Sequence, residues 1–142
     1  MKKVLLLMVA VMLVVGLMAG PALAAWDSKV TGEATWTWDG NNTNYVQLSA
    51  MKNADRTQGT IYWTQWRNGV LSHDIVADVY FLDVEGDTAY IKATDQNGKS
   101  IGAIIRDKGE PGFYDEGTIR YGNLDDDWGL NANHKYGNFQ VH

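Results

Sequence analysis

From residue 30 onward the chain consists of short runs in which apolar and polar residues alternate, with turn-forming residues between the runs. In the first run Val30 and Ala34 fall on one face and Thr31 and Glu33 on the other. Alternation with a period of two is typical of a half-buried strand, and no segment shows the spacing of an amphipathic helix. The pattern predicts an all-β fold of about 7–9 short strands, either a single antiparallel β-sandwich or a small β-barrel. Periodicity does not choose between these two architectures.

The strands are expected over residues 30–38, 46–50, 60–66, 75–84, 88–94, 101–105, 117–121 and 136–141. Glu85-Gly86-Asp87 is the expected centre of one hairpin, and Asn68-Gly69 ends the third run. Asn97-Gly98 is the strongest short hairpin motif in the chain, because both residues tolerate the positive φ of a type I′ turn.

Residues 1–24 have the features of a signal peptide. Lys2 and Lys3 precede an uninterrupted apolar stretch over residues 4–20, and small residues at Ala22 and Ala24 form a cleavage site. The interpretation predicts cleavage after Ala24, or one residue later, and a secreted or extracytoplasmic domain over residues 25–142. An uncleaved anchor is the alternative, since the stretch is short for a membrane span but long for a signal peptide, and Pro21 followed by the small-residue site favours cleavage. Cleavage removes two lysines and no acid, so the formal net charge falls from −5 to −7.

Composition excludes several classes of function. The chain has no cysteine, which rules out disulfides, thiolate zinc sites and cysteine nucleophiles. Its negative charge argues against nucleic acid as a partner, since phosphate binding needs a basic patch. Contact with a membrane is therefore expected only through the signal segment.

The most distinctive stretch is DKGEPGFYD at residues 107–115. Its central E-P-G-F fits a type II turn, with proline at the second position and glycine at the third. One hypothesis is a calcium site with Asp107, Glu110 and Asp115 as ligands, because hard cations take convergent carboxylate oxygens. The alternative, which we favour, is that the aspartates accept hydrogen bonds from loop amides and hold a tight corner. No other cofactor is expected. A second acidic stretch, residues 123–129, matches an EF-hand loop poorly and is interpreted as a solvated loop.

Aromatic residues suggest a binding surface, because sugars stack on exposed flat rings. Tyr62, Trp63 and Trp66 are the candidate ligand-binding residues, with Trp36 and Trp38 as further possibilities. Tyr62 and Trp66 share one strand face, and Trp63 lies on the opposite face. An extracellular glycan or a protein is the corresponding partner. The competing interpretation, that strand aromatics fill the core, is the more common outcome.

No catalytic constellation is recognisable. No serine lies in a G-x-S-x-G elbow, and the histidines lack zinc-ligand spacing. We therefore predict that the chain is not an enzyme. The alternatives are a secreted glycan hydrolase that uses two carboxylates and a barrel that holds a small apolar ligand.

Four segments resemble a group of small secreted domains, mostly bacterial, that carry the label post-COAP. They are GTIY at residues 59–62, GDTA at residues 86–89, the stretch at residues 105–115, and the terminal GNFQVH at residues 137–142. The resemblance spans about residues 30–142 and implies an all-β secreted module without known catalytic residues. It also moves the interpretation of residues 107–115 toward a fold-defining corner. The expected function is that of an exported, non-catalytic binding or structural module.

Overall fold

The computed structural model describes residues 25–38, 41–109, 115–122, 132–133 and 136–142. The predicted signal peptide at residues 1–24 lies outside these ranges. The described chain contains nine strands: β1 Ser28–Trp38, β2 Asn42–Lys52, β3 Thr57–Arg67, β4 Val70–Glu85, β5 Thr88–Asp95, β6 Ser100–Arg106, β7 Glu116–Tyr121, β8 Ala132–Asn133 and β9 Tyr136–Val141. Within the described ranges, no helix has the length and apolar character needed to cross a membrane.

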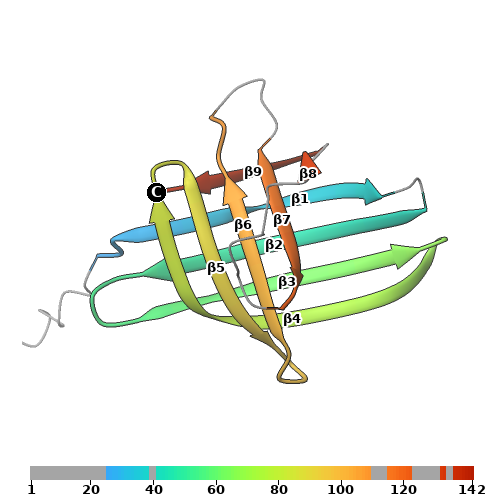
Figure 1. Cartoon of the computed structure of the whole chain (residues 1–142), viewed down its shortest axis with the longest axis horizontal. Helices are drawn as coiled ribbons and strands as arrows, with labels where there is room; N and C mark the ends of the chain where they lie inside the picture. The colour runs from blue at the N-terminus through green and yellow to red at the C-terminus, as the bar shows by residue number, and fades with distance from the viewer. Residues whose placement is uncertain (1–24, 39–40, 110–114, 123–131, 134–135) are drawn as a thin grey trace, which may run out of the picture.

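All strands belong to one antiparallel sheet in the order β8-β7-β6-β5-β4-β3-β2-β1-β9. The sheet curls strongly, so that β5, β6 and β7 run steeply across the long strands β1, β2 and β3 (Figure 1). The result is a half-barrel, which confirms the all-β antiparallel prediction. One continuous sheet supplies both walls of the core, with β8 and β9 as its two ends.

Strand β4 is the corner of this half-barrel. Its first part pairs with β3 from Val70 to Asp78, and its second part pairs with β5 from Ala77 to Glu85. The register shifts between Val79 and Phe81, so Tyr80 has no partner on β5. A bulge of this kind bends a strand and increases its local twist. One 16-residue strand therefore serves both walls, as its bent course in Figure 1 shows.

Strand β9 completes the sheet by pairing with β1, the strand most distant from it along the chain. The pairing runs from Val30↔Val141 to Thr35↔Tyr136. Gly137 permits this close approach, because a Cβ added there would lie 2.6 Å from the Cβ of Ala34. The two ends of the described chain are thereby joined side by side.

The core lies inside the curl and is built from the inward members of each alternating run. It includes Val30, Leu48, Ile61, Leu82 and Phe139, all at most 2% exposed. A small interior cavity lined by core residues has a volume of about 10 Å³. This is about the space of a single water molecule, which is too small for an organic ligand.

The turns correct one sequence prediction. At Asn97-Gly98 only Gly98 has a positive φ, and its amide donates to the carbonyl of Asp95, which makes a type I turn rather than type I′. The cause is Asp95, whose carboxylate accepts the amides of both Asn97 and Lys99. The type I′ turn occurs instead at Asn68-Gly69, where both residues have a positive φ.

The Asp95 carboxylate makes the stability of the fold depend on pH in the acid range. Burial raises the pKa of Asp95, but hydrogen bonds from the amides of Lys99 and Asn97 and from the Tyr121 hydroxyl, together with the charge of Lys99, lower it overall. A carboxyl whose folded pKa lies below its unfolded value of about 3.9 stabilises the fold above that pH. That stabilisation is lost as the pH falls through the folded pKa.

We therefore expect the melting temperature of Asp95→Asn to lie below that of the wild type at neutral pH and to approach it as the pH falls below about 4. Thermal unfolding followed by circular dichroism at several pH values measures this. Asp55→Asn, at an exposed loop position, is the control and should track the wild type throughout. A gap for Asp95→Asn that stays constant from neutral to acid pH would contradict the assignment.

Candidate binding groove on the outer face

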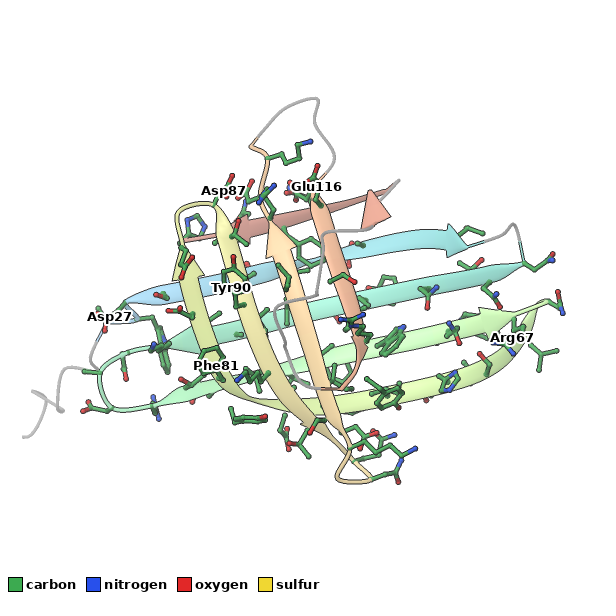
Figure 2. The ribbon with its side chains drawn as sticks, viewed as in Figure 1. Asp27, Arg67, Phe81, Asp87, Tyr90 and Glu116 are labelled. Carbon is green, nitrogen blue, oxygen red and sulfur yellow. The ribbon has the colours of Figure 1, made fainter. Side chains whose placement is uncertain are left out.

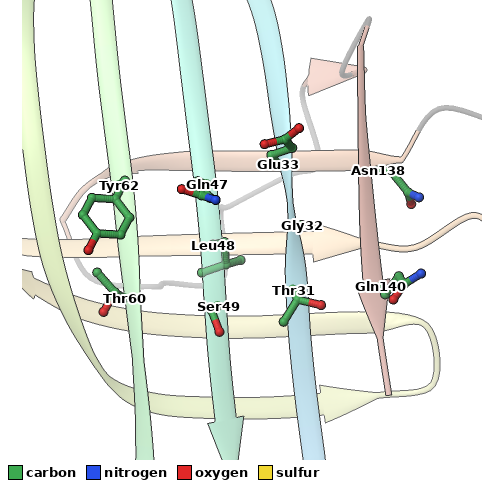
Figure 3. A pocket seen from close by; sticks show the side chains of 10 residues that line it. All are labelled: Thr31, Gly32, Glu33, Gln47, Leu48, Ser49, Thr60, Tyr62, Asn138 and Gln140. Carbon is green, nitrogen blue, oxygen red and sulfur yellow. The ribbon is translucent and has the colours of Figure 1, made fainter.

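The outer face of the sheet carries a groove over β9, β1, β2 and β3, with a volume of about 550 Å³. Sites for small ligands typically measure ~300–1,000 Å³. The lining residues, shown in Figure 3, are Thr31, Gly32, Glu33, Gln47, Leu48, Ser49, Thr60, Tyr62, Asn138 and Gln140. Apart from Gly32 and Leu48, they are the outward members of the alternating runs whose inward members form the core.

Strand register arranges eight of these side chains in two rows, each with one residue from each of the four strands. From β9 to β3, one row is Asn138, Glu33, Gln47 and Tyr62, and the other is Gln140, Thr31, Ser49 and Thr60. Adjacent strands lie about 4.8 Å apart, and residues two apart on a strand are separated by about 7 Å. Each row is therefore about 14 Å long, and the rows are about 7 Å apart.

The floor between the rows is backbone at Gly32. This residue has a φ of +156°, which L side chains rarely adopt, and it pairs with Phe139 on one side and Leu48 on the other. A Cβ on Gly32 would lie 2.6 Å from the Cα of Phe139 and closer still to the carbonyl oxygen of Asn138. Glycine at this position therefore allows β9 to lie against β1. Because Gly32 has no side chain, the groove is also deeper at this point than at the rows on either side.

Glu33 is the one aspartate, glutamate, lysine, arginine or histidine among the ten lining residues, all of which the structure describes. Its Oε2 accepts a hydrogen bond of 2.9 Å from the hydroxyl of Tyr45, on the neighbouring strand. The hydrogen bond to Glu33 raises the pKa of Tyr45, and burial and the negative charge of Glu33 raise it further. This pairing holds the Glu33 carboxylate at the edge of the groove and occupies one of its oxygens.

Of the aromatic residues singled out from the sequence, Tyr62 lies in the groove and is 48% exposed. Trp66 shares its face, as the alternation predicted, and is 44% exposed. Four residues separate the two along β3, which is about 13 Å. Trp66 thus lies on the same outer face but outside the groove lining.

Trp63 points to the opposite face, also as predicted, and packs against the core. Its Nε1 donates to Oδ1 of the buried Asn44 at 3.0 Å, and its ring centroid lies 5.7 Å from that of Tyr121. Because its indole N–H is satisfied inside the molecule, Trp63 belongs to the packing of the half-barrel rather than to the groove.

The two aspartates that flank the distinctive turn accept backbone amides, as the favoured interpretation expected. Asp115, which is 3% exposed, accepts the amides of Lys108 and Phe139. Asp107 accepts those of Gly109 and Val141. The two carboxylates thus join the β6–β7 corner to the edge of β9 that faces away from β1.

Ion pairs support the same corner. Arg106 lies 3.4 Å from Glu116 and 3.8 Å from Asp87, and Lys108 lies 3.0 Å from Glu116. Figure 2 shows Asp87 and Glu116 at the same end of the sheet. All four side chains are partly exposed, so each pair adds little by itself.

The remaining candidates lie outside the described residues. These are Glu110, the third calcium ligand of the hypothesis, the acidic stretch at residues 123–129, and the side chains of Trp36 and Trp38. Among the residues that the structure describes, no three histidine, aspartate or glutamate side chains are grouped as a metal site.

The polar members of the groove were missed by sequence reasoning as site residues, although the alternation placed Thr31 and Glu33 correctly on one face. The missing information was that β9 lies beside β1, which brings Asn138 and Gln140 into line with them. Comparison with protein-family models, curated proteins and solved structures finds no match to this chain.

Proposed function

We propose that this chain is an exported, non-catalytic β domain that binds its ligand outside the cytoplasm through the outer-face groove. The groove itself carries the proposal. It is a depression of about 550 Å³ lined by polar side chains that point away from the core and are not needed to fill it. The signal-peptide features of residues 1–24 and the resemblance to secreted post-COAP domains support the exported location.

Binding agrees with the groove better than hydrolysis does. Glycan hydrolysis by two carboxylates needs an acid and a nucleophile or base about 5–9 Å apart. The ten described lining residues contain a single carboxylate, Glu33, and it is hydrogen bonded to Tyr45. The small-ligand barrel also has little support, because the interior cavity that the described core residues line measures only about 10 Å³.

A groove-filling variant tests the proposal. Ser49 lies in the middle of one row, so Ser49→Trp should obstruct the groove. Thr43→Trp is the matched control, since it places the same side chain on the same strand and face about 20 Å away. The probe is an array that carries uncharged glycans, anionic glycans and extended peptides, and the labelled protein is applied after its fold has been checked by circular dichroism.

We expect the wild type and Thr43→Trp to retain the same array component, and Ser49→Trp to lose at least about tenfold in affinity for it, because a buried ligand cannot share the groove with an indole ring. Equal retention by the two tryptophan variants would remove the groove as the binding site. The absence of any retained component would overturn the proposal altogether.

A further inference from the structure

We infer that the ligand of this groove is an uncharged glycan chain, which lies across β9, β1, β2 and β3 with one sugar ring stacked on Tyr62. The inference rests on the proposed function and names its ligand class. Four observations carry it: the chemistry of the lining, the shape given by the two rows, the pairing of the strands beneath them, and the exposure of Tyr62.

The lining offers neutral hydrogen-bonding groups of both kinds. Gln47, Asn138 and Gln140 supply amides with donors and acceptors, and Thr31, Ser49 and Thr60 supply hydroxyls. Sugar hydroxyl groups are likewise donors and acceptors at once, so each finds a complementary partner without any net charge. The groove contacts therefore match a polyhydroxylated ligand.

Charge selects against anionic ligands. None of the ten described lining residues is a lysine, arginine or histidine, whereas phosphate, sulfate and carboxylate groups are recognised by arginine and lysine. The only charge in the lining is the carboxylate of Glu33, in a chain of net charge −5. An anionic glycan would meet repulsion here and no compensating contact.

The strands beneath the groove select against an extended peptide. Extended peptides commonly bind to sheets by adding a strand at a free edge, where main-chain hydrogen bonds supply affinity. In this groove β1 is paired with β2 and β9, and β2 is paired with β1 and β3. The backbone hydrogen-bonding groups at the centre of the groove are therefore occupied, so the hydrogen bonds offered to a ligand there come from the side chains of the two rows, which Figure 3 shows.

Tyr62 supplies the apolar surface that a sugar ring needs. It lies at the end of one row with 48% of its surface exposed. Its pairing partner on β4 is Val76, which is 42% exposed. Ring C–H groups of a sugar can lie against the tyrosine face while its hydroxyls reach Gln47 beside it. The row of about 14 Å continues from there to Asn138, which gives an elongated ligand its direction.

The test measures ligand binding to residues 25–142, the expected mature chain, by isothermal titration calorimetry. The uncharged probes are hexasaccharides of xylose, glucose, mannose and N-acetylglucosamine, and the anionic probes are galacturonate and heparin hexasaccharides. We expect one of the uncharged probes to bind with an affinity that changes little between about 0.05 and 0.5 M salt, because no ion pair is formed.

Two tyrosine variants locate the stacking. Tyr62→Ala should weaken binding about tenfold, whereas Tyr62→Phe should retain it, because the ring face and not the hydroxyl makes the contact. Tyr80→Ala is the control, since Tyr80 is exposed to a similar extent but lies outside the groove lining. A merely structural role of Tyr62 would appear as a lower melting temperature with unchanged affinity.

Each outcome decides between the two proposals. A peptide or an anionic glycan that binds the wild type and is lost in Ser49→Trp would overturn the uncharged-glycan assignment and leave the groove as the binding site. Uncharged-glycan binding that survives both Tyr62→Ala and Ser49→Trp would overturn both. Failure of every uncharged probe to bind would overturn the ligand class.

Discussion

Asp115→Ala is expected to lower the free energy of unfolding by about 3–5 kcal/mol. The Asp115 carboxylate is buried and accepts the amides of Lys108 and Phe139, which belong to segments far apart in the chain. Hydrogen bonds to a charged group contribute about 1.5–3 kcal/mol each, and their removal leaves buried donors without partners. Urea denaturation followed by tryptophan fluorescence measures the loss.

The paired variant Asp107→Ala provides the comparison. Asp107 also accepts two amides, those of Gly109 and Val141, but it is less buried and its bond to Val141 is 3.2 Å long. We expect a smaller loss of about 1–2 kcal/mol. If Asp115→Ala unfolds at the same urea concentration as the wild type, the corner does not hold β9 in the way described.

Gly32→Ala is expected to destabilise the fold by about 2–4 kcal/mol and to weaken ligand binding by the groove. The added Cβ would collide with the backbone of Asn138 and Phe139, so β9 would have to move away from β1. Backbone gives way less readily than a flexible side chain, and the φ of +156° adds strain. Denaturation experiments measure the first effect, and titration with the bound array component measures the second.

Gly98→Ala separates the collision from the effect of the backbone angle. Gly98 also has a positive φ, of 79°, but nothing lies within 4 Å of its added Cβ. Gly98→Ala should therefore destabilise the fold only by the about 1–2 kcal/mol that a non-glycine residue costs in the left-handed backbone region. It should leave ligand binding unchanged. Equal destabilisation by the two substitutions would show that contact between β1 and β9 is not what requires glycine at position 32.

Much of the fold was predictable because alternation is a local property. Val46, Leu48 and Ala50 alternate with polar residues, and the structure buries those three side chains. The curl was less predictable, because the bulge at Tyr80 shifts the buried positions from Ile75, Ala77 and Val79 to Leu82, and the continuous apolar run over residues 79–82 conceals that shift in the sequence. The turn at Asn97-Gly98 was misassigned because the side chain of Asp95, two residues earlier, determines the turn type.

The candidate site was predictable only in part, for a different reason. Tyr62 could be selected from the sequence because an aromatic residue on a polar face is unusual by itself. Gln140 and Asn138 could not, because a polar residue on a strand has meaning only once its neighbours are known. Those neighbours, Thr31 and Glu33, are more than 100 positions away in the chain. Sites that lie across strands are hidden in this way, whereas sites within a loop are not.

The amide contacts of Asp107 and Asp115 also have a consequence between molecules. A half-barrel leaves two sheet edges open, and an open edge can recruit the strands of neighbouring copies. Along β9 the outward amides of Phe139 and Val141 are already bound to the carboxylates of Asp115 and Asp107. An incoming strand therefore meets carboxylates instead of free amides along this part of β9, which opposes edge-to-edge polymerisation there in a domain without disulfides.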